Sequence, residues 1–129
     1  EQAEPVVAAV DSAGALRVFR QKRLHLSDAA DAPWATVNAV GRAMHAADLD
    51  GDGRLELVVS DFAAPGDGDE LRVLRLEDDG NARVLFRGER HKGGIAAITS
   101  GNLDGEGGQE IVVFVRDPHA TRGELWIVR

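Results

Sequence analysis

Short apolar runs bounded by Gly, Asp, Asn and Pro recur along the whole chain. Residues 16–20 and 71–76 alternate apolar and polar side chains, the pattern of strands with one buried face. Residues 57–59 and 111–115 are continuously apolar, which predicts strands buried on both faces. No window of a dozen residues shows a helical stripe, and residues 28–31 allow one helical turn. The pattern therefore predicts an all-β fold.

Ten strands are expected from these runs. They are short, rich in Val, Ile and Leu, and separated by turn-forming residues, as in antiparallel sheets. The expected strands are residues 6–10, 16–20, 35–40, 43–47, 57–59, 71–76, 83–87, 95–99, 111–115 and 125–129.

The chain repeats itself with a period of about 54 residues. Residues 48–59 and 102–113 share 7 of 12 positions at an offset of 54. The hairpin that follows each of these segments is also repeated, and a third copy of the hairpin lies at residues 6–20. The acidic, glycine-rich loop precedes the two later hairpins and not the one at residues 6–20.

The repeat predicts a single domain, 1–129, in three units. These are a partial repeat at 1–42, a full repeat at 43–93 and a partial repeat at 94–129. Four short antiparallel strands per repeat predict the blades of a β-propeller. The chain would hold about two and a half blades, whereas closed propellers have about 4 to 8. We therefore expect an incomplete propeller, or one completed by oligomerisation or by a partner.

The first acidic loop has the residue types that calcium prefers. Asp48, Asp50, Asp52 and Glu56 lie at alternating spacing around glycines that permit a tight curl. Calcium binds six to eight oxygen atoms at about 2.3–2.6 Å, mostly from carboxylates and carbonyls. We expect these four carboxylates, together with a backbone carbonyl near Arg54, to form a calcium site.

The second acidic loop repeats this set in a weaker form. Its candidate ligands are the side chains of Asn102, Asp104, Glu106 and Glu110 and the backbone at Gly108. It has three carboxylates where the first loop has four, and the longer Glu106 replaces an aspartate. We therefore expect two Ca²⁺ sites, with the 48–56 loop binding more tightly than the 102–110 loop.

Two other interpretations compete for the acidic loops. An EF-hand would require a bidentate Glu at position 12, where Val59 and Val113 stand, and flanking helices in place of strands. A simple turn is the second alternative, because Asp and Gly favour turns without any metal. Two copies with ligand-type residues at four matching positions favour the metal site.

These loops, with the apolar runs that follow them, resemble the FG-GAP/VCBS repeats of integrin α-subunit-like β-propellers. The resemblance covers residues 43–129, and the family's Asp-x-Asp-x-Asp-Gly-x-x-Asp pattern is met at 48–56 with Glu for the last Asp. It implies four-stranded antiparallel blades, a calcium loop between the first two strands of a blade, and an extracellular or periplasmic setting. The family's Phe-Gly and Gly-Ala-Pro elements are not clearly present, which favours the broader bacterial VCBS-like branch.

Charge and composition exclude several classes of partner. The formal net charge of −7 disfavours nucleic acid and anionic membrane surfaces. The chain has no Cys, which excludes disulfides and Cys-ligated metals, and no apolar run reaches the ~20 residues of a membrane span. With a signal peptide presumed removed, we expect an extracellular, cell-surface or periplasmic protein.

The sequence predicts a binding or structural module and no enzyme. No Gly-x-Ser-x-Gly motif and no phosphate-binding glycine loop occurs. We expect a protein partner, or self-association, through open blade edges. One alternative is an accessory subunit of a larger extracytoplasmic complex docked through those edges, and another is a polysaccharide hydrolase or lyase.

A few further residues invite two interpretations each. Trp34 and Trp126 fit core packing, or an interface anchor or platform for a carbohydrate ligand. Because Trp126 lies near an expected free edge, we expect a partner to cover it. His45 fits a strand face or a neighbour of the metal ligands. The basic clusters at 21–23 and 87–92 fit solvated turns or a subunit contact.

Overall fold

The computed structural model describes residues 6–20, 33–62, 67–116 and 122–129. Ten strands and no helix lie within these residues, so the all-β prediction is confirmed. The strands are β1 (Val6–Val10), β2 (Leu16–Arg20), β3 (Ala35–Val37), β4 (Val40–Ala47), β5 (Glu56–Asp61), β6 (Leu71–Leu76), β7 (Ala82–Arg87), β8 (Gly94–Gly101), β9 (Glu110–Arg116) and β10 (Gly123–Val128).

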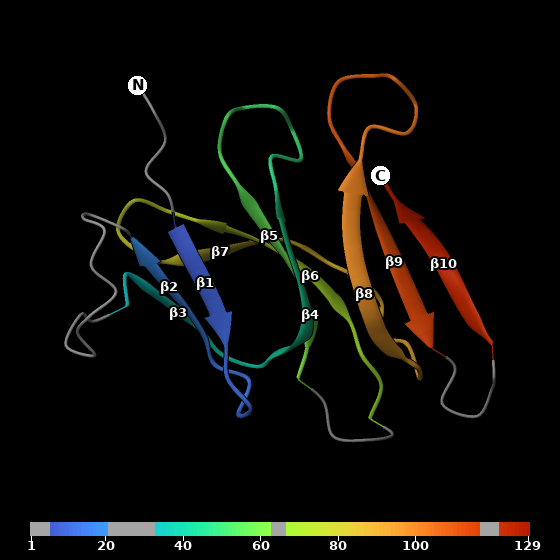
Figure 1. Cartoon of the computed structure of the whole chain (residues 1–129), viewed down its shortest axis with the longest axis horizontal. Helices are drawn as coiled ribbons and strands as arrows, with labels where there is room; N and C mark the ends of the chain where they lie inside the picture. The colour runs from blue at the N-terminus through green and yellow to red at the C-terminus, as the bar shows by residue number, and fades with distance from the viewer. Residues whose placement is uncertain (1–5, 21–32, 63–66, 117–121) are drawn as a thin grey trace.

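The strands form three antiparallel sheets that follow the order of the chain (Figure 1). The N-terminal sheet has the order β1-β2-β3, the central sheet β4-β5-β6-β7 and the C-terminal sheet β8-β9-β10. Each sheet is a meander of hydrogen-bonded neighbours, and none is closed. The full repeat thus forms a four-stranded sheet between two three-stranded ones.

The two middle strands of the central sheet, β5 and β6, are buried on both faces. Leu57 and Val59 belong to the apolar cluster shared with the N-terminal sheet, whereas Val58 belongs to the cluster shared with the C-terminal sheet. Successive side chains of a strand point to opposite faces, so a continuously apolar strand fills both interfaces. The predicted two-sided burial of residues 57–59 is therefore confirmed.

The same prediction is wrong for residues 111–115. Ile111, Val113 and Val115 are buried against the central sheet. Val112 and Phe114 point to the other face, where Phe114 is exposed and Val112 only half-buried. The physical reason is that the described residues place a sheet on one side of β9 only.

The expected strand at 35–40 is divided between two sheets. β3 ends at Val37, and β4 begins at Val40 in the central sheet. Between them Ala39 adopts a φ of 58°, a left-handed conformation that breaks a strand. The carbonyl of Ala39 accepts a hydrogen bond from the Phe62 backbone N–H at 3.0 Å, which holds this corner against the central sheet.

Two of the sequence predictions, the helical turn at 28–31 and the basic cluster at 21–23, lie outside the described residues. Within the described part of the chain, no helix has the length and apolar character needed to cross a membrane.

Candidate metal centre

The two acidic loops lie side by side at one end of the molecule (Figure 1). Each connects the first strand of its sheet to the second, β4 to β5 and β8 to β9. They are joined directly, because the Gln109 backbone N–H donates a 2.8 Å hydrogen bond to the Leu49 carbonyl. Because Leu49 also packs on the apolar cluster between the central and C-terminal sheets, the loops and the core are coupled.

Hydrogen bonds to aspartate side chains curl the first loop. The two carboxylate oxygens of Asp48 accept bonds from the backbone N–H groups of Gly51 and Gly53, at 2.8 and 2.9 Å. These glycines have φ values of 76° and 86°, which only glycine adopts without strain. Asp50 accepts a further bond from the Asp52 backbone N–H at 3.2 Å. The local sequence therefore shapes the loop without any external ligand.

Glu56 closes the loop from the first position of β5. Its side chain is only 1% exposed, and Oε2 accepts a 2.9 Å hydrogen bond from the Leu49 backbone N–H. The bond joins the start of the loop to its end. Burial of a carboxylate is costly unless it is paired, so this residue needs a positive partner.

The second loop repeats three of the internal hydrogen bonds of the first loop at the same relative positions. Asn102 Oδ1 accepts from the Gly105 N–H at 2.7 Å, as Asp48 does from Gly51. Glu110 Oε2 accepts from the Leu103 N–H at 2.7 Å, as Glu56 does from Leu49. The repeat detected in the sequence therefore extends to the hydrogen bonds of the two loops.

Three of the predicted ligands of the first loop are brought together. Asp48, Asp50 and Glu56 each offer an oxygen atom within 4.8 Å of the others. Asp52 stands outside this group, with one carboxylate oxygen accepting the Arg54 backbone N–H at 2.8 Å. Such a group could hold a metal ion.

In the second loop no comparable group of three carboxylates forms among the residues that the structure describes. Asn102 and Glu106 are tied to each other, because the Asn102 amide donates a 2.6 Å hydrogen bond to the Glu106 carbonyl. Asp104 accepts the Glu106 N–H at 2.9 Å. The roles of Asp104, Glu110 and the Gly108 carbonyl as ligands stay predictions.

Arg75 of β6 lies among the carboxylates of the first loop. It is the register partner of Glu56 and donates from Nε and Nη2 to Glu56 Oε1, at 2.9 and 2.6 Å. Nη2 also donates to Asp50 Oδ2 at 2.8 Å and lies 3.5 Å from Asp52 Oδ2. A cation of this chain is therefore bound by the same carboxylates that could bind a metal.

The contacts of Arg75 shift the pKa values of the groups involved. The hydrogen bond from Arg75 holds the pKa of Asp50 below its usual value. Hydrogen bonds to Glu56 and then to Asp50 raise the pKa of Arg75. Both groups are therefore charged at neutral pH.

The sequence contains a partial signal for Arg75. The strand segments Leu16–Arg20, Leu71–Arg75 and 125–129 all end in arginine, and each begins with leucine. In the second loop the register partner of Glu110 would be Arg129, one residue beyond the Val128–Ile111 pair. Recognising the partnership requires the register of the hairpin, which the sequence pattern alone does not provide.

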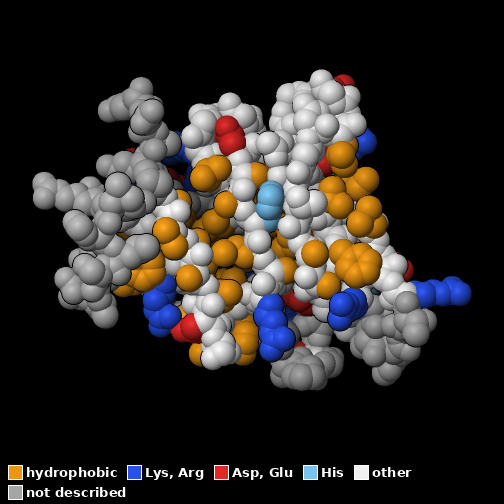
Figure 2. Space-filling view, in the orientation of Figure 1, with side chains coloured by type: hydrophobic (Ala, Val, Ile, Leu, Met, Phe, Trp, Pro, Cys, Tyr) orange, Lys and Arg blue, Asp and Glu red, His pale blue; other side chains and the backbone are white. Residues whose placement is uncertain are grey.

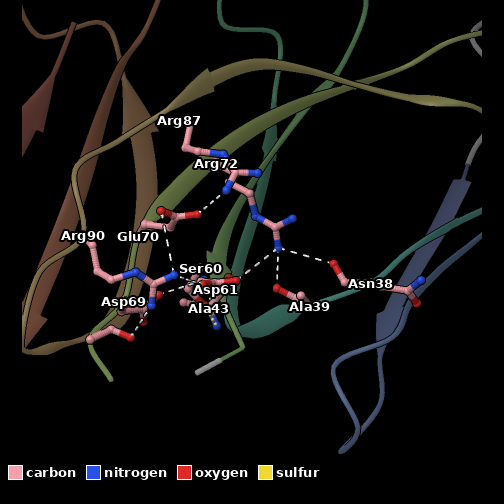
Figure 3. A network of polar contacts seen from close by, with 11 residues as sticks. Asn38, Ala39, Ala43, Ser60, Asp61, Asp69, Glu70, Arg72, Arg87 and Arg90 are labelled. Atoms are coloured by element: carbon pink, nitrogen blue, oxygen red, sulfur yellow. Dashed lines mark hydrogen bonds and ion pairs between the residues drawn. The ribbon is translucent and has the colours of Figure 1, made fainter. Parts of the chain in front are cut away.

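A second polar cluster occupies the opposite end of the central sheet (Figure 3). The buried Arg72 donates from Nη2 to the Ala39 carbonyl and lies 3.7 Å from Asp61 Oδ1. Asp69 links two sheets, because its carboxylate accepts the N–H groups of Asp61 at 2.7 Å and of Ile95 at 2.9 Å. Sequence reasoning missed this cluster because its residues are far apart along the chain and only the pairing of the strands brings them together.

The basic segment 87–92 takes part in the same cluster. Arg87 donates to Glu70 at 2.6 Å, and Arg90 donates to Asp61 at 2.8 Å. Its arginines therefore have intramolecular acidic partners, while the side chains of Arg87 and Arg90 stay 57% and 48% exposed, as expected of a solvated segment. A subunit contact here stays a prediction. The cluster fastens the β6–β7 hairpin to the end of β5.

The remaining residues of interest pack within the chain. His45 Nε2 lies 2.9 Å from Ser100 Oγ, so it sits on the strand face between the central and C-terminal sheets. The ring of Trp126 packs edge-on against His91, with centroids 4.7 Å apart, and contacts the apolar core. Trp34 contacts the other apolar cluster. The packing interpretation thus holds for both tryptophans. The residues on either side of Trp126 on β10, Leu125 and Ile127, are exposed.

The two acidic loops of this chain resemble each other in both sequence and hydrogen bonds. Within the described residues there are two sheet-to-sheet interfaces and one group of three carboxylates close enough to hold a metal ion. No protein-family model, curated protein or solved structure matches the chain.

Proposed function

We propose that this chain is a calcium-binding, extracellular module of β-propeller type, with a binding or structural role. The observation that carries the proposal is the group formed by Asp48, Asp50 and Glu56, whose oxygen atoms lie within 4.8 Å of one another. Its sheets would be propeller blades, and its acidic loops would be stiffened by metal. The loops would then fix the ends of neighbouring sheets relative to each other.

Calcium suits this group better than other common metals. The donors are all hard oxygen atoms, and calcium accepts six to eight of them in irregular geometry. Magnesium demands a near-ideal octahedron, which a curled loop of this kind does not impose. Asp52 and the Arg54 carbonyl would complete the set after a small movement of the loop.

Arg75 affects how tightly the first loop binds calcium. It offsets one of the four negative charges that the carboxylates of the first loop carry. A metal must displace the Nη2 contacts to reach Asp50 and Glu56. That the first loop binds calcium more tightly than the second therefore stays a prediction. Arg75 reduces the difference in affinity that we expect between the two loops.

An extracellular setting suits sites of this kind. Extracellular calcium modules bind with dissociation constants of about 10⁻⁴–10⁻³ M, which fit millimolar calcium outside the cell. Exposed loops with a displaceable arginine would belong to this weak class. Localisation is part of the proposal and follows from the affinity expected of the loops.

Thermal unfolding in calcium and in EDTA tests the proposal. Each filled site stabilises the fold by about 2.7 kcal/mol at a hundredfold excess over Kd, so the melting temperature should rise clearly in calcium. Magnesium at the same concentration should give a smaller rise. Identical melting in calcium and in excess EDTA would overturn the proposal.

A matched pair of variants shows where calcium acts. Asp50→Asn removes a carboxylate of the first loop, whereas Asp67→Asn removes an exposed carboxylate outside both loops. Only the first should reduce the calcium-dependent rise in melting temperature. Isothermal titration calorimetry of the wild-type chain counts the ions, and we expect two.

An accessory subunit of a larger complex is the second candidate. The observation that favours it is the exposed apolar surface of the edge strand β10, at Leu125 and Ile127. Such a subunit would be monomeric and poorly stable when purified alone. Sedimentation of the pure chain separates this candidate from a self-associating module.

A further inference from the structure

The C-terminal sheet has an apolar face that no other part of the described chain covers. Cross-strand pairing aligns Leu125 with Phe114, and Ile127 with Val112, on the side away from the central sheet. Leu125 is 66% exposed and Ile127 is 55% exposed. Figure 2 shows hydrophobic side chains at the surface over this sheet. We name these four residues the outer face.

The corresponding residues of the central sheet show which element covers such a face. At the offset of 54 residues, Leu125 corresponds to Leu71 and Ile127 to Val73. Leu71 and Val73 are only 6% and 5% exposed, because they pack against β9 of the next sheet. The same positions are therefore buried in the central sheet and bare in the C-terminal sheet.

The N-terminal sheet follows the same rule. Leu16 and Val18 begin its Leu-Arg-Val-x-Arg strand, as Leu71 and Val73 begin theirs. Both are fully buried, in the cluster that contains Leu57. The N-terminal and central sheets thus each pack two matching residues of their hairpin onto the following sheet. The C-terminal sheet has no following sheet among the described residues.

The receiving side of each interface is also a repeated pair. In the central sheet it is the cross-strand pair Leu57 and Leu74, and in the C-terminal sheet it is the pair Ile111 and Val128. All four contact the preceding sheet.

The register of the N-terminal hairpin places Val7 opposite Phe19 at these same receiving positions. Val7 is exposed, and Phe19 is half-buried. We name this pair, together with Ala9, the receiving face. Among the described residues, the chain therefore has one uncovered face of each kind, at opposite ends of its row of sheets.

We propose that the outer face of one chain binds the receiving face of a second copy, so that the chain assembles head to tail. The two interfaces inside the chain are the template, because both join the residues that correspond to these two faces. Contacts of this kind are heterologous and form rings or open filaments according to the angle between copies. This inference does not depend on calcium binding.

A mixing experiment with two variants tests this mode of assembly. Ile127→Asp places a charge in the outer face, and Val7→Asp places one in the receiving face; both side chains are exposed, so the fold of the single chain should persist. Circular dichroism melting verifies folding before association is measured. Leu85→Asp, on an exposed leucine outside both faces, is the matched control.

We expect wild type and Leu85→Asp to grow in sedimentation coefficient with concentration, and each face variant to associate about tenfold or more weakly. An equimolar mixture of the two face variants should form a 1:1 dimer and nothing larger, because each retains one intact face. A wild-type monomer at the highest soluble concentration would overturn the proposal. A mixture that stays monomeric would also overturn it. So would undiminished association of Val7→Asp alone, the result expected if two outer faces pack on each other.

Discussion

Arg75 and Glu56 face each other across β5 and β6, with two hydrogen bonds from the guanidinium to one carboxylate oxygen, at 2.9 and 2.6 Å. Glu56 is almost fully buried, so Arg75 supplies the charge that makes its burial tolerable. The same guanidinium also donates a hydrogen bond to Asp50, which lies within the loop. Arg75 therefore stabilises the metal-free loop and competes with any cation for it.

Arg75→Gln should lower stability without metal and raise calcium affinity. Loss of the charged hydrogen bonds to Glu56 should cost about 1.5–3 kcal/mol in the free energy of unfolding in EDTA. Because calcium no longer has to break those bonds, its affinity for the first loop should increase by roughly tenfold or more. Urea unfolding in EDTA and calorimetric titration measure the two effects.

Arg83→Gln is the control for this pair of effects. Arg83 is exposed on β7 and is the cross-strand neighbour of Arg75, so its substitution removes the same charge nearby. Both measurements should match wild type. An Arg75→Gln protein with unchanged calcium affinity would show that the arginine and the metal do not share ligands.

The two buried glutamates allow each loop to be tested separately. Glu56→Gln and Glu110→Gln each preserve an oxygen that can accept the loop N–H bond, and each removes one charge. Each should reduce the number of bound calcium ions by one, as counted by calorimetry. Glu56→Gln should also destabilise the metal-free protein more, because it removes the charge partner of Arg75. Loss of both ions in either variant would show that the loops are coupled.

Local features of the loops could be predicted from sequence. The curl of the first loop depends on Asp48 and on glycines three and five residues later, all within one short segment. The repeat also predicted three similar hairpins, because a strand pattern and its turns are encoded locally.

Features that depend on register could not be predicted in this way. Arg75 reaches Glu56 across two strands, and Asp69 reaches Ile95 across two sheets. A shift of one residue in pairing would send either side chain to the opposite face. The bare face at Phe114 was missed for a related reason, since an apolar residue does not reveal whether a neighbouring sheet is present.

Gly51→Ala should destabilise the protein through backbone strain alone. Gly51 has a φ of 76°, and a Cβ atom there would meet nothing within 4 Å. A left-handed conformation costs a non-glycine residue about 1–2 kcal/mol, which urea unfolding in EDTA should detect. Gly107→Ala is the control, since Gly107 is equally open and is not among the glycines with positive φ. Equal effects of the two substitutions would contradict the strain argument.

Asp69→Asn should destabilise the junction of the central and C-terminal sheets and change its response to pH. The amide would direct an NH₂ group at either the Asp61 or the Ile95 N–H, and leaving that donor unpaired should cost about 1–3 kcal/mol. Burial raises the pKa of the Asp69 carboxyl, although its hydrogen bonds oppose the shift. The folded protein therefore binds this proton more readily than the unfolded chain does.

The sign of the pH effect follows from that raised pKa. The titration of Asp69 favours folding most below the unfolded-state pKa of about 3.9, and the benefit declines as pH rises through the folded-state pKa. The stability of wild type relative to Asp69→Asn should therefore increase as pH falls from neutral toward about 4. Urea unfolding at a series of pH values measures this difference, with Asp67→Asn as an exposed control. A difference that shrinks on acidification would mean that the hydrogen bonds from Asp61 and Ile95 outweigh the cost of burying the carboxylate.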